Sequence, residues 1–545
     1  MPGESGHSPS VPDRSYTRWL ALFAMVLVLL FFAGVRWRLR NMPLERDEGE
    51  YAYAGQLILQ GIPPYQLAYN MKLPGSYLAY AALLGLFGQT PAGIHVGLLL
   101  VNLFSSLLVF FLGRRLINER AGIVAAAAFA LFSTSTSVMG LAAHATHFVT
   151  LFAVSGTLLV LAARKTHGAG LSFAAGLCMG LAFVMKQPGG VFIAFGLFEL
   201  AWDAWKQKLP VPKILSACAS YCLAAVLPYA LTCFWLYRAG VFPRFWFWTV
   251  SYARQYATST GFAEGLGYLG QGCSRIFLSA PILWMLVLAG LALCIFLRRN
   301  TSGLLLRLLA WSFLGASAGL YFREHYFIVM LPVAALLTGL AVDAATEFFR
   351  GRGQATAWQL LPAAVFGAGL ILAVWTARAN LLQRTPDEVV RHLYGGNPFP
   401  EARTFGDYIQ AHTDPAARIL VLGSEPEVYF YAHRRSATGY IYTYGLMEEQ
   451  KFASQMQREM MQEIEASRPE YVVKVAVAES WLPKAHSDTT ILAWSERYLA
   501  EEYQVIGAAD ISWITTYYWN EDAASHMPRT RNSIYLLKRK VRPAS

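Results

Sequence analysis

Long apolar runs separated by short polar connections fill the first 380 residues of the chain. Each run is long enough, or nearly so, to cross about 30 Å of hydrocarbon as a helix. The runs lie near residues 20–35, 92–112, 121–139, 142–162, 170–185, 189–204, 214–236, 279–297, 303–321, 325–343 and 358–377. The pattern therefore predicts a polytopic α-helical membrane protein with about eleven transmembrane helices.

From about residue 380 the pattern becomes that of a soluble domain. Short β-branched runs at Ile419–Gly423, Tyr471–Val475 and Ser533–Leu537 alternate with helical stretches such as Glu448–Ser467. This alternation predicts a small C-terminal α/β domain. The predicted division is an N-terminal tail (1–18), a transmembrane body (19–379) with an outer loop at 37–90, and the α/β domain (380–545). The segment Gly423-Ser-Glu-Pro lacks the G-x-G-x-x-G pattern, so no nucleotide cofactor is expected.

Composition narrows the class. Charged residues make up 14% of the chain, against about 25% in soluble domains, which excludes an ordinary soluble enzyme. The net charge is +11, but the basic residues form short clusters between apolar runs rather than one basic face, so no nucleic acid partner is expected. The six cysteines show no metal-ligand spacing, and we predict no metal or cofactor.

Orientation follows from these clusters, because short cytoplasmic loops are enriched in Lys and Arg. If the spans alternate, the clusters share one side; they are Arg114, Arg115 and Arg120, Arg164 and Lys165, Lys206, Lys208 and Lys213, Arg298, Arg299 and Arg307, and Arg350 and Arg352. This predicts a cytoplasmic N-terminus, with the loop at 37–90, the loop at 238–278 and the C-terminal domain outside. Arg36, Arg38 and Arg40 argue the other way for the first span alone.

Acidic residues are rare in the body, yet four of them lie within six residues after the first span: Glu45, Asp47, Glu48 and Glu50. Crowded carboxylates repel one another, which is costly unless a cation or a catalytic role compensates. The alternative is structural, since Asp47–Glu50 fits an Asp-x-x-Glu capping box before a helix. From spacing alone, capping is favoured over catalysis.

The residues that follow alter this balance. Tyr51–Gln60 and Ser76–Phe87 fit helices lying on the membrane, and Lys72 stands between them. Carboxylates and a lysine on one outer loop would provide a base and a phosphate-binding cation at the bilayer surface. Lys72 could equally be a snorkelling lysine.

These residues resemble the first outer loop of the GT-C membrane glycosyltransferases. The closest branch is the bacterial relatives of the protein O-mannosyltransferases and the lipid A aminoarabinose transferase. The resemblance covers about residues 19–345 and is most specific at 46–88. The matching segments are Arg46-Asp-Glu-Gly-Glu-Tyr-Ala-Tyr-Ala54, Gly61-Ile-Pro-Pro-Tyr65, Met71-Lys-Leu-Pro74 and Leu86-Phe-Gly88.

The resemblance implies a polyprenyl-phosphate sugar donor and a role for each matching residue. Asp47, with Glu48 beside it, becomes catalytic. By this resemblance, the donor phosphate would be bound by Lys72, Lys186, Arg323 and His325. The substrate would be contacted by Glu50, Tyr51, Tyr65 and Tyr326. One departure is His144-Ala-Thr-His147, where relatives often carry an acidic residue; we expect a hydrogen-bonded histidine there.

The expected function is therefore an inverting membrane glycosyltransferase of the bacterial inner membrane, acting at the outer face. Its partners would be a polyprenyl-phosphate sugar, membrane lipids, and an envelope lipid, glycan or protein acceptor. A lipid or glycan transporter or flippase and a non-catalytic scaffold are the rivals. The aromatic stretch 242–256 is interpreted as an interfacial anchor by default, with an acceptor lip as the alternative.

Overall fold

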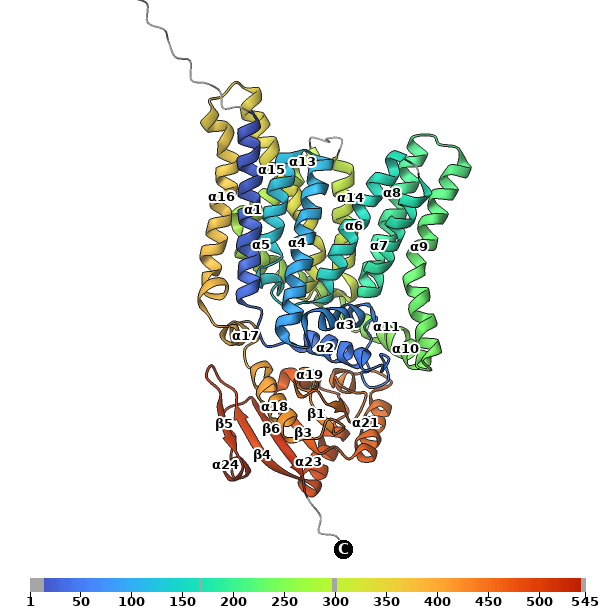
Figure 1. Cartoon of the computed structure of the whole chain (residues 1–545), viewed down its shortest axis with the longest axis vertical. Coiled ribbons are helices and arrows are strands. Elements are labelled where there is room, and N and C mark those ends of the chain that lie inside the picture. The colour runs from blue at the N-terminus through green and yellow to red at the C-terminus, as the bar shows by residue number, and fades with distance from the viewer. Residues whose placement is uncertain (1–13, 167, 297–300, 541–545) are drawn as a thin grey trace, which may run out of the picture.

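The structure, a computed structural model, describes residues 14–166, 168–296 and 301–540, and consists of a helical body with a C-terminal domain at one end (Figure 1). Residues 1–13 of the predicted tail lie outside the described residues. The long helices of the body are α1 (Arg14–Arg38), α4 (Pro91–Leu116), α5 (Glu119–Phe132), α6 (Ala145–Thr166), α7 (Ala169–Met185), α8 (Gly190–Lys206), α9 (Val211–Arg238), α13 (Pro281–Phe296), α14 (Ser302–Ala316), α15 (Leu331–Gly351) and α16 (Thr356–Arg378).

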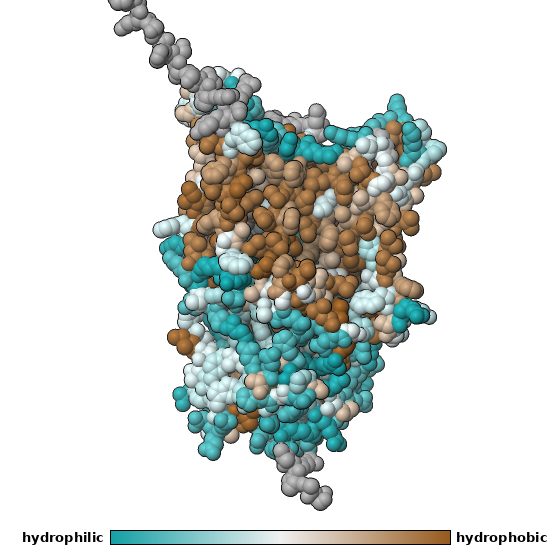
Figure 2. All heavy atoms as spheres, viewed as in Figure 1, coloured by the Kyte–Doolittle hydropathy of each residue, from teal (hydrophilic) through white to brown (hydrophobic). Residues whose placement is uncertain are grey.

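These helices occupy all of the predicted apolar runs. By length and composition, six helices in the described part of the chain could each cross a membrane, or seven if α12 and α13, which are bent by 114°, form one broken span. Helices α7 and α14 are apolar but shorter. Figure 2 shows an apolar band across the visible face of the body, between two hydrophilic rims. The body is thus membrane-embedded, and the count of eleven crossings stays a prediction.

The basic connections gather at the end of the body opposite the C-terminal domain. Arg18 of α1 contacts Glu119 at 2.6 Å, and Arg120 contacts Asp343 at 3.0 Å. Figure 1 places the start of α1, the α8–α9 connection and the α15–α16 connection at this same end. Arg298 and Arg299 lie outside the described residues. The charge asymmetry between the two ends, on which the predicted orientation rests, is therefore present in three dimensions.

Small residues let the helices approach closely. A Cβ at Gly176 or Gly180 of α7 would lie 2.1 Å from the Tyr221 carbonyl oxygen or 2.3 Å from the Ala225 carbonyl oxygen of α9. Membrane helices pack through such small residues because lipid offers no hydrophobic drive for their association. This contact holds α7 in place, and α7 ends beside Lys186.

Shorter helices, among them α2, α3, α10 and α11, lie between the body and the C-terminal domain (Figure 1). The short helices of the two outer loops are α2 (Arg46–Leu59), α3 (Gly75–Phe87), α10 (Phe242–Trp246), η3 (Phe247–Tyr252), α11 (Ala253–Ala257) and α12 (Phe262–Ser279). The first two match the predicted interfacial helices. Helices α10, η3 and α11 lie in the aromatic stretch 242–256, for which an interfacial helix was one interpretation, whereas α12 was not predicted, because its polar positions and glycines break the apolar run.

The C-terminal domain is built on one mixed sheet, in the order β2-β1-β3-β6-β4-β5 for the described residues. Strands β2, β1 and β3 are parallel, and the remaining pairs are antiparallel. The strands are β1 (Arg418–Leu422), β2 (Arg435–Ser436), β3 (Tyr471–Ala476), β4 (Tyr503–Asp510), β5 (Thr516–Trp519) and β6 (Ser533–Arg539). The helices are α17 (Pro386–Tyr394), α18 (Phe399–His412), α19 (Glu427–Ala432), α20 (Tyr444–Met447), α21 (Ala453–Ser467), α22 (Ala478–Trp481), α23 (Thr490–Glu502) and α24 (Glu521–Ala524). Strands β1, β3 and β6 are the three predicted ones, and α21 lies within the predicted helix 448–467.

A buried arginine fixes this domain to α2. The Arg46 guanidinium donates to the Ser424 carbonyl oxygen and pairs with Glu425, both at 2.6 Å. A buried pair that loses one partner leaves an uncompensated charge, which makes the contact costly to break. The segment that follows β1, for which no nucleotide was expected, is thus used to dock the domain onto the outer loop.

Candidate active site

The first turn of α2 presents Asp47, and its cap is not the one that the sequence suggests. Glu45 is the N-cap: its carboxylate accepts from the Glu48 backbone N–H at 2.9 Å, and the Glu48 carboxylate accepts from the Glu45 N–H at 3.3 Å. The capping box is therefore Glu45–Glu48, and the Asp47–Glu50 box is wrong by two residues. Asp47, as the second residue of the helix, is free for another role.

Asp47 forms an ion pair with Lys72. The Lys72 Nζ lies 2.7 Å from Asp47 Oδ1 and 2.7 Å from Glu50 Oε2, and the Tyr442 hydroxyl donates to the same Asp47 Oδ1 at 2.8 Å. Burial alone would raise the pKa of Asp47, but Lys72, together with the neighbouring His325 and His144, holds that pKa well below its usual range. For Glu50 burial wins and the pKa is raised. Asp47 is therefore the ionised carboxylate that faces Lys72.

Asp47 and Lys72 open into a cavity of about 450 Å³, a volume typical of small-ligand sites. Of the residues predicted for the site, those that line this cavity are Asp47, Tyr51, Lys72, Lys186, Arg323, His325 and Tyr326. The structure thus brings together side chains from α2, the loop after it, the end of α7 and the segment before α15.

Three predicted site residues are placed behind the cavity wall instead. The Glu48 carboxylate is buried and accepts from the Ala143 N–H at 2.6 Å while contacting His95 at 3.0 Å. The Tyr65 hydroxyl donates to the Lys72 carbonyl oxygen at 2.6 Å. Glu50 accepts from Lys72 without reaching the cavity. These three side chains do not line the cavity, and their polar atoms are used within the fold, so a catalytic role of Glu48 and substrate contacts of Glu50 and Tyr65 stay predictions.

Two basic side chains at the cavity form no ion pair. Within the described residues, neither Lys186 nor Arg323 forms a salt bridge; Lys186 Nζ lies over the Tyr326 ring at 4.0 Å and the Arg323 guanidinium over Tyr321 at 5.5 Å. Lys72, by contrast, is held by two carboxylates and has one of its three protons left to donate. Burial, with Lys72 and Arg323 nearby, lowers the pKa of the Lys186 ammonium to about 7. Arg323 therefore carries the unpaired positive charge of the cavity, and Lys186 is a cation that titrates near neutral pH.

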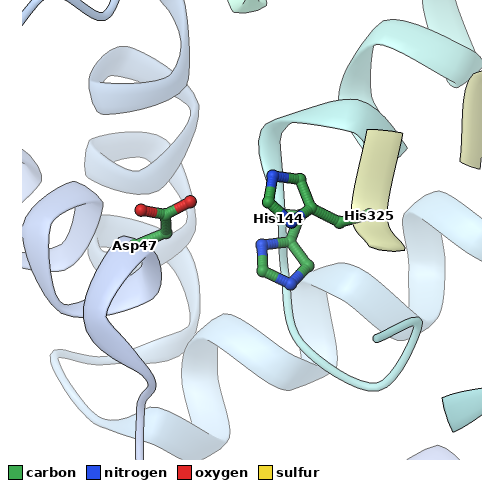
Figure 3. Close-up of side chains that lie close together, drawn as sticks. All are labelled: Asp47, His144 and His325. Carbon is green, nitrogen blue, oxygen red and sulfur yellow. The ribbon is translucent and has the colours of Figure 1, made fainter. Parts of the chain in front are cut away.

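Two histidines face Asp47 across the cavity (Figure 3). The rings of His144 and His325 stack with centroids 4.2 Å apart, and one ligand atom from each of Asp47, His144 and His325 lies within 4.8 Å of the others. The ring nitrogens of the buried His144 have no hydrogen-bond partner among the described residues, although Nδ1 lies 3.6 Å from a Glu45 carboxylate oxygen. The expected hydrogen-bonded histidine of this segment is His147, which hydrogen bonds to the Gly140 backbone, and not His144. Two imidazoles and a carboxylate fit a divalent transition metal, a grouping that the sequence analysis did not anticipate.

The C-terminal domain and the second outer loop complete the wall. Tyr440, Tyr442, Tyr444 and Glu448 line the cavity from the domain, and Glu448 accepts from the Tyr252 hydroxyl at 2.6 Å. Tyr252, Tyr256 and Trp248 line it from the stretch 242–256. This stretch is thus packed between the body and the domain. Its position at the cavity fits the alternative interpretation, a lip at the acceptor site, better than the default interpretation as an interfacial anchor. Its aromatic richness was the available signal; nothing in the local sequence marked Tyr442.

A search of solved structures finds proteins with a similar fold. In its fold the chain resembles ArnT from Cupriavidus metallidurans bound to undecaprenyl phosphate, with a TM-score of 0.54 at 15% identity, over 96% of this chain and 98% of that one. ArnT in the apo state matches with a TM-score of 0.52 at 17% identity, over 92% and 98%. The archaeal oligosaccharyltransferase AglB from Archaeoglobus fulgidus, in complex with an inhibitory peptide and a dolichol-phosphate, matches with a TM-score of 0.54 at 13% identity, over 92% and 75%.

A family model adds evidence from sequence. The model of the dolichyl-phosphate-mannose-protein mannosyltransferases matches residues 72–235, beginning at Lys72 and ending in α9. A search of curated protein sequences gave no significant match. The resemblance to the GT-C glycosyltransferases, stated from residues 46–88, is confirmed.

Proposed function

We propose that this protein is a glycosyltransferase that moves a sugar from a polyprenyl-phosphate donor to an envelope lipid, glycan or protein at the outer face of the bacterial inner membrane. The observation that carries the proposal is that one cavity holds an ionised Asp47, paired with Lys72, together with two basic side chains that form no ion pair in the described structure, Lys186 and Arg323. The neighbours bound to undecaprenyl phosphate and dolichol-phosphate support a lipid phosphate as the ligand.

The cations would stabilise the leaving group. Breaking the bond between the anomeric carbon and the phosphate oxygen builds negative charge on the phosphate, and positive groups aimed at that oxygen lower the barrier. Lys186 and Arg323 have no carboxylate to leave before they bind it. The third proton of Lys72 can join them, and its approach to the phosphate would weaken its contact with Asp47.

Asp47 would accept the proton of the acceptor. Its low pKa makes it a weak base in the free protein, but withdrawal of the Lys72 charge toward the phosphate raises that pKa toward the range in which a carboxylate is an effective base. Attack from the face opposite the phosphate inverts the anomeric centre, as in glycosidases that place a base and an acid on opposite faces.

A deletion strain tests the function. Mass spectrometry of envelope glycolipids, glycans and glycoproteins should show loss of one glycosylated species and accumulation of one polyprenyl-phosphate sugar, both reversed by the parental gene. If the glycosylated species and the lipid-linked sugars are unchanged, the proposed function is wrong. Accumulation of a completed glycan without its export would instead favour the transporter.

A further inference from the structure

One side chain of the C-terminal domain touches the proposed base directly. Tyr442 lies on the connection between β2 and α20, and its hydroxyl donates to Asp47 Oδ1 at 2.8 Å. The two residues are 395 positions apart in the sequence. The contact therefore exists only when the domain is docked on α2.

The connection that carries Tyr442 is fixed on both sides. The next residue, Thr443, is fully buried; its N–H donates to Ser424 Oγ and its hydroxyl to the Ser480 carbonyl oxygen, both at 2.9 Å. On the other side, the Gly439 carbonyl oxygen accepts from the Tyr69 N–H of the outer loop at 2.7 Å. Because the backbone on both sides of Tyr442 is fixed, its side chain is preorganised and loses little conformational freedom when the hydroxyl makes its hydrogen bond.

The contact also selects one oxygen of Asp47. Lys72 and Tyr442 both reach Oδ1, and in the described residues no side chain donates to Oδ2. A carboxylate anchored through one oxygen keeps the other available for a substrate proton. The Lys72 Nζ lies 5.3 Å from the Tyr442 ring centroid, so the same side chain also borders the ammonium group.

We propose that Tyr442 is a positioning residue for Asp47, so that the C-terminal domain forms part of the catalytic centre. This inference rests on the proposed glycosyltransferase activity. Tyr442 orients the carboxylate, and Asp47 performs the proton transfer; the hydroxyl itself exchanges no proton with the substrate.

The test is the Tyr442→Phe variant of the full chain, purified and reconstituted in proteoliposomes with a radiolabelled undecaprenyl-phosphate hexose and envelope extract as the acceptor source. A hydrogen bond to a charged group supports a fall in kcat of about tenfold or more. The donor KM should stay within about twofold of the parent, because Lys186 and Arg323 are untouched. Tyr503→Phe is the matched control: it removes a buried hydroxyl that donates to the Pro469 carbonyl oxygen at 2.7 Å, away from the cavity, and should keep the parental kcat.

A double-mutant cycle separates positioning from general support of the fold. If Tyr442 acts through Asp47, adding Tyr442→Phe to Asp47→Asn should cost less than twofold in kcat. Rates are referred to folded protein, measured by thermal unfolding in detergent. A parental kcat in Tyr442→Phe, or a loss that adds in full to that of Asp47→Asn, overturns the inference while leaving the function standing. A parental protein that transfers no sugar from any polyprenyl-phosphate donor overturns both.

Discussion

The cations of the cavity differ in what holds them, and so their removal should have different consequences. Lys72 balances Asp47 and Glu50, whereas Lys186 and Arg323 form no ion pair within the described residues. A residue that compensates buried charge supports the fold as well as the chemistry, while an uncompensated cation acts when an anion arrives.

Lys186→Ala and Arg323→Ala should each raise the donor KM by about 10- to 100-fold, the value of a charge-assisted hydrogen bond, with an unchanged unfolding temperature. Lys72→Ala should lower both transfer and stability, by about 3–5 kcal/mol of unfolding free energy, because it leaves buried carboxylates without a counter-charge. Lys165→Ala, an exposed lysine at the opposite end, serves as the control. Equal losses of stability in all three cavity variants would refute this division of roles.

At this scale the sequence could identify Asp47 and Lys72 because both lie in one short segment with an unusual density of charge. It could not show that Glu45 caps α2, because the predicted box Asp47–Glu50 and the observed box Glu45–Glu48 have the same spacing. Tyr442 was missed because its partner is distant in sequence and an isolated tyrosine carries no local pattern. His144 was noted, but its grouping with Asp47 and His325 could not be predicted, since the three residues lie far apart in the chain.

Among the secondary-structure elements, the contact between α2 and α19 determines how the domain meets the site. A Cβ added at Gly49 of α2 would lie 2.6 Å from the Glu427 backbone nitrogen, closer than atoms can pack, so glycine is required where these helices touch. Apolar length predicted the long helices well. It gave no indication of α12, whose apolar face alternates with polar residues, and it could not reveal which helix the domain would contact.

Gly49→Ala should therefore force α2 and α19 apart. The expected cost is about 1–3 kcal/mol, typical of overpacking, together with reduced transfer because Tyr442 is displaced from Asp47. The measurements are thermal unfolding and the transfer rate. Gly85→Ala on exposed α3, where the nearest atom would be 3.8 Å away, should leave both unchanged or slightly improve stability. An undisturbed Gly49→Ala variant would show that the helices are not tightly coupled.

On the scale of the whole molecule, charge and position agree. The basic connections lie at one end, and the helices of the first outer loop and the sheet lie at the other (Figure 1). The positive-inside tendency therefore predicts that the cavity between them lies outside the cytoplasm. Sequence alone could supply the charge pattern but not the contact between domains, which joins residues almost 400 positions apart.

Cysteine labelling tests this orientation. In a chain with its six native cysteines replaced, including the exposed Cys273, Ala466→Cys at the exposed end of α21 should react with a membrane-impermeant maleimide in intact spheroplasts. This position is preferable to Ser467, whose hydroxyl is buried. Thr356→Cys, in the opposite connection, should react only after lysis. The reverse pattern would place the domain in the cytoplasm and exclude action at the outer face.

The most direct measurement of the central claim compares Asp47→Asn with the parent in the reconstituted transfer assay. Because Glu45 rather than Asp47 caps α2, Asn should change the unfolding temperature by less than about 2 °C, while loss of the proton acceptor should lower kcat by about 10²- to 10⁴-fold. Asp387→Asn is the matched control, since Asp387 occupies the same second helical position of α17 behind the cap Thr385, away from the cavity, and should transfer at the parental rate. A folded Asp47→Asn protein that transfers sugar as fast as the parent would remove Asp47 from the mechanism and contradict the account.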